Sequence, residues 1–238
     1  MWPFVKKKSI KDSNLLAGGC DFHSHLLPGV DDGVATLQES VEALTAYEGS
    51  GISDIWLTPH IMEDFPNKID KLREYHAALC SAYKGKITLH LAAEYMLDGA
   101  FDGLLDKNEF LPIGEGGNHL LVETSYFTPP INLDSTLQRI KSKGFHPLLA
   151  HPERYIYMDK ARYNELRDKG IKFQLNIMSL VGAYGYEAQK KAKWMLKNDM
   201  YTVAGSDLHS AEALELIADT PLDSKQSAKL HSLINNRI

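Results

Sequence analysis

Short apolar segments alternate along the chain with segments of helical period. The apolar segments are rich in β-forming residues and are predicted to be seven strands, at residues 20–24, 54–58, 87–94, 119–123, 146–151, 171–176 and 201–206. Strands that alternate with helices are typical of parallel β/α units, so we predict an α/β fold. Seven such units around one axis would form a β/α barrel, and an open doubly wound sheet would show the same pattern.

Three of the intervening segments carry helix signals. Residues 37–44 have one apolar face, and Thr36 with Glu39 is typical of a capping box at the start of that helix. Apolar stripes at residues 69–83 and 133–140 predict two more helices. These helices are expected to cover the outside of the parallel strands.

The composition is that of an ordinary globular protein. The chain has 238 residues, of which 44% are hydrophobic and 24% charged, so disordered, collagen-like and disulfide-scaffold classes are excluded. The net charge of -5 gives no general attraction to nucleic acid. The only cysteines, Cys20 and Cys80, form no CxxC motif, which argues against a thiolate zinc site and fits the reducing cytoplasm.

We divide the chain into an N-terminal tail, residues 1–17, and a single domain, residues 18–238. Lysines at positions 6–8 follow Trp2 and Phe4, which is the reverse of a secretory signal. This cluster could touch a membrane surface, but we favour a solvated or loosely packed tail. Nowhere does the sequence approach the roughly 20 consecutive apolar residues that span a bilayer, so we expect no membrane span.

Potential metal ligands fall at the ends of six of the seven predicted strands. In parallel β/α folds these carboxyl ends converge on one face. His-x-His after the first strand and Asp-x-His after the last each point two side chains to the same side, because alternate strand residues share a face. The candidate ligands are His23, His25, His60, Glu94, Glu123, His151, Asp207 and His209.

Several other titratable residues have a simpler interpretation. Asp31 and Asp32 could be ligands or could equally be turn residues ahead of a helix. His76 lies on the apolar stripe of a predicted helix, where a packed histidine is expected. The remaining histidines have no partner at a strand end, so we interpret them as structural: His90, His119, His146 and His231.

Imidazole and carboxylate ligands without thiolate favour manganese, iron or zinc. With Asp32 the set has nine members, which is more than one ion needs. Two or three divalent ions that share a bridging Glu94 could bind phosphoryl oxygens and generate hydroxide near neutral pH. Such a centre would attract phosphate locally, although the whole chain is acidic.

Residues 21–33, Asp-Phe-His-Ser-His-Leu-Leu-Pro-Gly-Val-Asp-Asp-Gly, resemble the PHP superfamily of phosphoesterases, and more narrowly its capsule-type (CpsB/CapC-like) manganese-dependent protein-tyrosine phosphatases. The resemblance runs from about residue 20 to about residue 216. It implies a distorted seven-stranded β/α barrel (PHP, TIM-like) with three divalent ions, and it favours Asp32 over Asp31. The implied ligand sets are His23, His25, Glu94 and Asp207; Glu94, Glu123 and His151; and Asp32, His60 and His209.

The resemblance also implies the reaction. In His-Pro-Glu-Arg-Tyr, Arg154 would bind the substrate phosphate, for which a planar guanidinium is well suited, although it could instead pair with a neighbour such as Glu153. Relatives with histidine in place of Asp32 and Glu123 tend to be histidinol phosphatases. Some relatives carry a second arginine near the position of Leu214.

We therefore expect a cytoplasmic phosphotyrosine phosphatase that works by attack of metal-bound hydroxide, because no cysteine is followed by the arginine of a cysteine-dependent phosphatase. The expected substrate is the tail of a bacterial tyrosine kinase that controls capsule or exopolysaccharide synthesis. A histidinol-phosphatase-like phosphomonoesterase and a non-catalytic metal-stabilised binding module are the alternatives.

Overall fold

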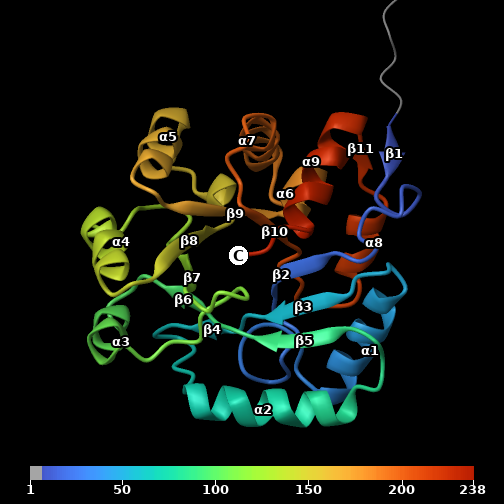
Figure 1. Ribbon diagram of the computed structural model, residues 1–238, viewed down its shortest axis with the longest axis horizontal. Helices are drawn as coiled ribbons and strands as arrows, with labels where there is room; N and C mark the ends of the chain where they lie inside the picture. Colours follow the sequence, from blue (N-terminus) through green and yellow to red (C-terminus); the bar gives the residue numbers. More distant parts are fainter. Residues whose placement is uncertain (1–6) are drawn as a thin grey trace, which may run out of the picture.

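A computed structural model describes residues 7–238 and shows a mixed α/β fold with a curled parallel sheet (Figure 1). The parallel strands form two hydrogen-bonded sheets, one with the order β2-β3-β5 and one with the order β10-β9-β8-β7-β6-β4. Their bounds are β2 Cys20–Ser24, β3 Asp54–Leu57, β4 His60–Ile61, β5 Thr88–Leu91, β6 Glu94–Met96, β7 His119–Glu123, β8 His146–Ala150, β9 Lys172–Asn176 and β10 Val203–Gly205.

Two of the predicted strands are each divided into two. The segment predicted at 54–58 forms β3 and then β4, and the segment predicted at 87–94 forms β5 and then β6. Pro59 lies at the first break and has no backbone N–H to donate to a neighbouring strand. The prediction that His60 and Glu94 end strands is therefore wrong: each begins the second part, and the two lie opposite each other in β4 and β6.

The ends of the sheet approach each other where β2 meets the segment after β10. The Asp207 amide donates to the His23 carbonyl at 2.8 Å, and the His25 amide donates to the Leu208 carbonyl at 2.8 Å. A parallel bridge also joins Ser24 to Leu208. These contacts bring the first and last predicted ligand pairs together.

Helices lie around the outside of the strands (Figure 1). The three helices predicted from the sequence are confirmed as α1, α2 and α4, and α1 has the predicted capping box between Thr36 and Glu39. The helices are α1 Leu37–Glu48, α2 Ile69–Ala82, α3 Phe101–Lys107, α4 Leu133–Ser142, α5 Lys160–Asp168, α6 Ile177–Val181, α7 Tyr186–Lys197, α8 Ala213–Ala218 and α9 Ser224–Ile234. A 3-10 turn, η1, spans Pro152–Arg154.

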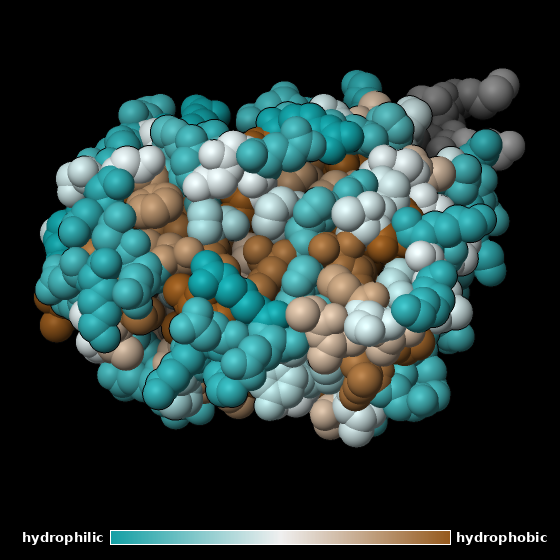
Figure 2. All heavy atoms as spheres, turned by 60° about the horizontal axis from the view of Figure 1, so that its bottom comes forward, coloured by the Kyte–Doolittle hydropathy of each residue, from teal (hydrophilic) through white to brown (hydrophobic). Residues whose placement is uncertain are grey.

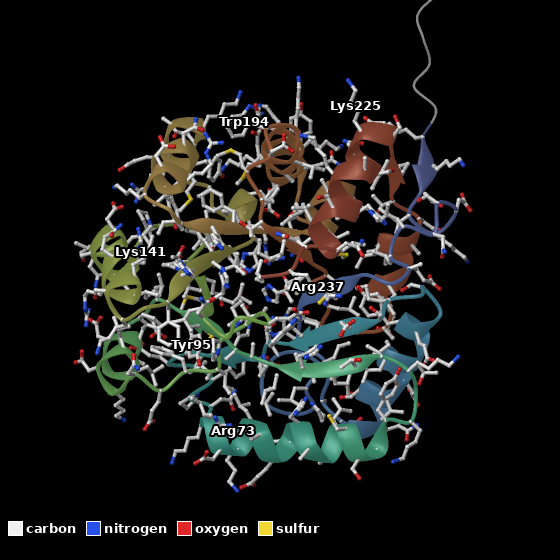
Figure 3. The ribbon with its side chains drawn as sticks, in the orientation of Figure 1. Arg73, Tyr95, Lys141, Trp194, Lys225 and Arg237 are labelled. Carbon is white, nitrogen blue, oxygen red and sulfur yellow. The ribbon has the colours of Figure 1, made fainter. Side chains whose placement is uncertain are left out.

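The hydrophobic core has two parts. A smaller cluster that includes Phe22, Leu121 and Leu148 forms from alternate positions of the strands, and a larger one fills the space between strands and helices. Figure 3 shows Tyr95, a member of the larger cluster, well inside the labelled outer residues Arg73 and Lys141. The face in Figure 2 is mostly hydrophilic, with hydrophobic groups exposed between the polar ones.

The N-terminal segment packs against the domain. Strand β1, Lys8–Ser9, pairs antiparallel with β11, Pro221–Leu222, and Ile10, Leu15 and Leu16 are buried. The expectation of a solvated or loosely packed tail is therefore wrong for residues 8–17, because these apolar side chains are covered by the C-terminal elements. Trp2, Phe4 and Lys6 lie outside the described residues. Among residues 7–238, no helix is long and apolar enough to cross a membrane.

Asp21 joins three parts of the fold. This carboxylate is buried and accepts hydrogen bonds from the Ser206 amide at 2.8 Å, the Ser206 hydroxyl at 2.6 Å, the His23 amide at 3.1 Å and the Tyr47 hydroxyl at 3.0 Å. Burial raises the pKa of Asp21, while the four donors favour its ionised form. The carboxylate thereby connects β2, α1 and the segment after β10.

We predict that Asp21→Ala lowers the free energy of unfolding by about 3–5 kcal/mol, because it leaves several buried donors without an acceptor. Tyr47→Phe removes one donor and keeps the ring, so its cost is about 1 kcal/mol. Urea denaturation of both variants measures the difference. Equal losses in the two variants would show that Asp21 does not have this connecting role.

Candidate metal centre

The structure brings all nine candidate ligands together at one site. Four overlapping groups have ligand atoms that all lie within 4.8 Å of one another. These groups are His25, Asp32, His60 and His209; His23, His25 and Asp207; His23, Glu94 and His151; and His60, Glu94 and Glu123. Because the groups share members, they form one continuous cluster.

The deepest part of the cluster surrounds two imidazole nitrogens. Nε2 of His23 and Nε2 of His25 lie 3.0 Å apart. Glu94 Oε2 is 3.2 and 3.4 Å from these two atoms, and Asp207 Oδ1 is 3.5 and 3.3 Å from them. All four side chains are buried. Buried nitrogen and oxygen atoms that lie this close together are the ligand set expected around a metal cation.

A second part of the cluster includes His60, Glu123 and His151, which also lie close to Glu94. His60 Nδ1 is 3.2 Å from Glu94 Oε2 and 3.1 Å from Glu123 Oε1, and His151 Nε2 is 3.0 Å from Glu94 Oε1. Despite these short distances, His60 Nδ1 and Glu94 Oε2 are buried without a hydrogen bond among the described residues. Buried polar atoms are normally satisfied, so a cation shared by these atoms fits the site.

The third part opens to solvent. Asp32 Oδ1 lies 3.5 Å from Nε2 of both His60 and His209, and the side chains of Asp32 and His209 are 57% and 35% exposed. The three residues that the resemblance groups as one set therefore lie together. Glu123, which the resemblance groups with His151, lies nearer to His60, at 3.1 Å against 3.8 Å.

Two of the candidate ligands have a left-handed backbone. His151 has φ 34° and Asp207 has φ 55°. This conformation is uncommon for residues other than glycine, and it is often found where a structure forces a side chain into a functional site. His151 directly follows β8, and Asp207 lies two residues after the end of β10, so both residues sit where a parallel strand has just ended.

Sequence analysis missed residues that orient the candidate ligands. Asp31 Oδ2 lies 2.8 Å from His25 Nδ1 and accepts from the His60 amide at 3.0 Å. The Gln174 side-chain oxygen lies 3.1 Å from His23 Nδ1 and accepts from the His151 amide at 3.2 Å. Such contacts fix which imidazole nitrogen faces the centre. The sequence analysis considered Asp31 as a ligand or a turn residue but not in this orienting role, and nothing in the sequence pattern marked Gln174.

The buried charges shift one another's pKa values. Burial favours neutral forms, but His23 and neighbouring imidazoles hold the pKa of Glu94 well below its ordinary value, and the pKa of Asp207 is lowered in the same way. In turn, Glu94 and Asp207 outweigh burial and raise the pKa of His23 to about 9. The carboxylates of Glu94 and Asp207 and the imidazole of His23 therefore favour each other's charged forms.

Arg154 lies at the edge of this cluster between two aromatic rings. Its guanidinium carbon is 4.3 Å from the centre of the Tyr126 ring and 3.9 Å from that of Tyr184. It donates to Asp207 Oδ2 at 2.8 Å, and its side chain is 16% exposed. The sequence pattern did not mark these two tyrosines. Their rings pack against the guanidinium, whose remaining N–H donors lie in its own plane.

Arg154 pairs with the carboxylate of Asp207 and not with Glu153, the neighbour named as the example in the alternative interpretation. Glu153 is buried on the other side, where it accepts from the Asn176 amide at 3.0 Å and the Tyr201 hydroxyl at 2.9 Å. Asn176 also donates from its side chain to Asp207 Oδ2 at 2.8 Å. The carboxylate of Glu153 therefore anchors the turn that carries Arg154.

Three of the histidines interpreted as structural have side-chain contacts with polar atoms outside the cluster. His76 Nε2 lies 3.2 Å from the Leu89 carbonyl, and His90 lies 2.9 Å from Asp54. His119 Nε2 lies 2.7 Å from the amino group of Lys172. These contacts agree with their interpretation as structural residues.

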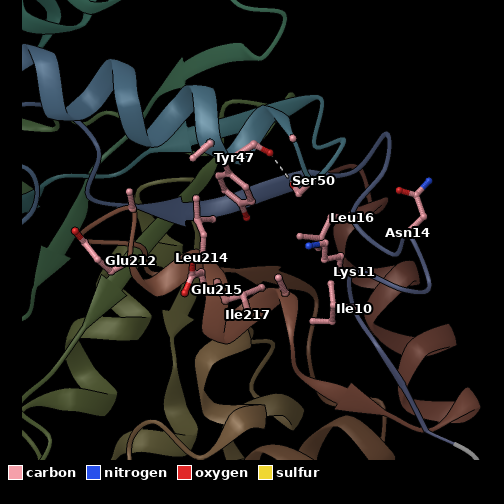
Figure 4. Close-up of a pocket in the computed structure, with 14 residues that line it drawn as sticks. Ile10, Lys11, Asn14, Leu16, Tyr47, Ser50, Glu212, Leu214, Glu215 and Ile217 are labelled. Carbon is pink, nitrogen blue, oxygen red and sulfur yellow. Dashed lines mark hydrogen bonds between the residues drawn. The ribbon is translucent and has the colours of Figure 1, made fainter.

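Leu214 lies away from the nine candidate ligands. It lines a cavity of about 590 Å³ between α1, α8 and the N-terminal segment, together with Ile10, Tyr47 and Ile217 (Figure 4). None of the nine candidate ligands is among the described residues that line this cavity.

Cys20 is buried, which raises the pKa of its thiol and makes it a poor nucleophile.

Known proteins resemble this chain over most of its length. The family described as "Capsular polysaccharide synthesis, CpsB/CapC" matches residues 19–215. The tyrosine-protein phosphatase CpsB of Streptococcus pneumoniae is 28% identical over 212 residues, which cover 81% of this chain and 84% of that protein. The tyrosine-protein phosphatase YwqE of Bacillus subtilis (strain 168) is 27% identical over 198 residues, covering 81% and 78%.

The fold has a solved counterpart. One of the crystal structures of YwqE from Bacillus subtilis and CpsB from Streptococcus pneumoniae, described as unique metal-dependent tyrosine phosphatases, superimposes with a TM-score of 0.76. The sequences are 24% identical, and the alignment covers 92% of this chain and 95% of the other. Because the family pattern extends over residues 19–215, this chain belongs to the CpsB/CapC family.

Proposed function

We propose that this chain is a metal-dependent protein-tyrosine phosphatase, a hydrolase of phosphoric monoesters. The observation that carries the proposal is the cluster of nine imidazole and carboxylate side chains with Arg154 at its edge. The relatives named tyrosine-protein phosphatases support phosphotyrosine as the substrate. A cytoplasmic protein of this kind would act on a phosphotyrosyl protein, and we propose the tail of a bacterial tyrosine kinase that controls capsule or exopolysaccharide synthesis.

The cluster would hold three divalent ions, for which we propose manganese, with iron or zinc as chemically similar occupants. The proposed ligands are His23, His25, Asp32, His60, Glu94, Glu123, His151, Asp207 and His209. Glu94 would bridge two ions, because its two oxygens face different imidazoles. When bound, the ions would polarise the phosphoryl group and activate water for attack on phosphorus.

The protein's own residues would orient the substrate and the ligands. The edge of the Arg154 guanidinium would bind two phosphate oxygens, while Tyr126 and Tyr184 prevent it from turning. Asp31 and Gln174 would keep the imidazoles of His25 and His23 directed at the centre. Much of the catalytic geometry would therefore exist before the substrate binds.

We also propose that the two sheets work as one distorted seven-stranded barrel of the PHP type. Residues 18–238 would form this single phosphoesterase domain. The hydrogen bonds between the end of β2 and the segment after β10 support the proposal.

Removal of metal should abolish the activity. Chelator-treated protein is expected to lose hydrolysis of a phosphotyrosyl peptide, and Mn²⁺ should restore it. The reason is that the bound ions, and not a cysteine, would activate the attacking group. Thiol alkylation serves as the control and should have little effect. Inactivation by the thiol reagent without any effect of chelator would contradict the proposal, and faster turnover of histidinol phosphate would change the substrate class.

The stability of the metal-free protein should depend on pH. The folded-state pKa of His23, about 9, exceeds the value of about 6.5 for an unfolded imidazole. Its contribution to stability is therefore fully present below about pH 6.5 and is lost as the pH rises through about 9. We expect the free energy of unfolding of chelated protein to fall between these pH values.

Bound Mn²⁺ should remove this decline, because a cation would replace the protons at the same nitrogens. Urea denaturation at several pH values, with chelator and with Mn²⁺, measures both effects. An identical pH dependence under the two conditions would argue against metal binding at His23.

Arg154→Lys and Arg154→Ala should retain their manganese but lose activity. Lysine keeps the charge without the two-pronged geometry, so both variants are expected to lose about ten- to a hundredfold in kcat/KM, the equivalent of about 1.5–3 kcal/mol. Arg162→Ala, which alters an exposed ion pair on α5, is the matched control. Kinetics on a phosphotyrosyl peptide with measured metal content decide the point, and an unchanged kcat/KM would exclude Arg154 from phosphate binding.

A further inference from the structure

Three large hydrophobic side chains are exposed in the chain segments that carry Tyr126, Arg154 and Tyr184. Phe127 is 71% exposed, Ile156 is 66% exposed and Tyr186 is 73% exposed. Each lies within two residues of a member of the group formed by Tyr126, Arg154 and Tyr184. We call these three exposed side chains the apolar rim.

The three segments that carry the apolar rim meet at the guanidinium of Arg154. The guanidinium carbon lies 4.3 Å from the centre of the Tyr126 ring and 3.9 Å from that of the Tyr184 ring. The backbone amide of Ile156 donates to the Tyr126 carbonyl at 2.9 Å, which fixes these two segments side by side. The apolar rim therefore adjoins the one group in the proposed site that would bind the phosphate directly through a side chain.

Exposure of large apolar side chains around a charged site is typical of a binding surface. Their position next to Arg154 determines what the surface can bind. A ligand whose phosphate reaches Arg154 would place its neighbouring atoms against the rim. A small phosphomonoester would end there, whereas an extended peptide continues past the site at about 3.3 Å per residue.

We propose that the apolar rim binds apolar side chains that flank the phosphotyrosine in an extended peptide. This inference rests on the proposed function and extends it, because it specifies a peptide substrate with apolar residues beside the phosphotyrosine. Phe127, Ile156 and Tyr186 supply the contact area, and Arg154 supplies the charge that positions the phosphate. Recognition of the flanking residues is then separate from the chemistry at the metal ligands.

Binding of two non-hydrolysable peptides tests the inference. Both carry a phosphonate analogue of phosphotyrosine, with leucine on either side in one peptide and serine in the other. Manganese-loaded wild-type protein is expected to bind the leucine-flanked peptide about tenfold more tightly, because apolar surface is buried on the rim. Calorimetry or fluorescence anisotropy gives the two dissociation constants without any turnover.

The triple variant Phe127→Ala, Ile156→Ala and Tyr186→Ala should bind both peptides equally, at the affinity of the serine-flanked one. Its hydrolysis of p-nitrophenyl phosphate should not change, because none of the three residues belongs to the proposed catalytic site. Tyr75→Ala is the matched control, since Tyr75 is 45% exposed on α2 but is not part of the rim. This variant should keep the wild-type preference.

Equal binding of the two peptides by the wild-type protein would overturn the inference, as would a preference that survives in the triple variant. Self-association of the wild-type protein that the triple variant abolishes, without any peptide preference, would show instead that the rim contacts a second copy. A rim-dependent preference in a protein that hydrolyses no phosphotyrosyl peptide would sustain the rim and contradict the proposed function. Hydrolysis of a phosphotyrosyl peptide without a preference for the leucine-flanked peptide would support the proposed function and contradict the inference about the rim.

Discussion

The structure depends on the burial of acidic groups that need opposite charge nearby. Glu94 and Asp207 are buried, and neighbouring imidazoles hold the pKa of both carboxyl groups below the ordinary value. An isolated carboxylate at such depth would be strongly unfavourable. The surrounding imidazoles satisfy this requirement by holding protons, or by sharing cations with the carboxylates. The groups that meet in the cluster come from strands of both sheets and from the segments that follow them.

Asp207 connects the cluster with the proposed phosphate site. Its Oδ1 faces the imidazoles of His23 and His25, while its Oδ2 accepts from Arg154 and Asn176. The position of the guanidinium is therefore coupled to the position of a candidate ligand. Asp207 makes these contacts from a left-handed backbone conformation, which is uncommon for residues other than glycine.

Three layers of decreasing burial describe the site from the inside outwards. The innermost carboxylates and imidazoles are inaccessible to solvent, Arg154 is partly exposed between two tyrosines, and the apolar rim faces solvent. Electrostatic interactions are strongest where water is excluded, so charge is concentrated in the first layer. Selectivity among substrates would reside in the outer layer, which can vary without disturbing the charge balance.

The sequence by itself determined the local features of this protein. The helical stripes, the capping box of α1 and the paired ligands in His-x-His and Asp-x-His follow from spacings of a few residues, which the backbone geometry of helices and strands converts directly into shared faces. Only the tertiary structure decided that Gln174 supports His23 and that Tyr126 and Tyr184 pack against Arg154. These contacts join residues far apart in the chain, and neither periodicity nor composition records which distant side chains will meet.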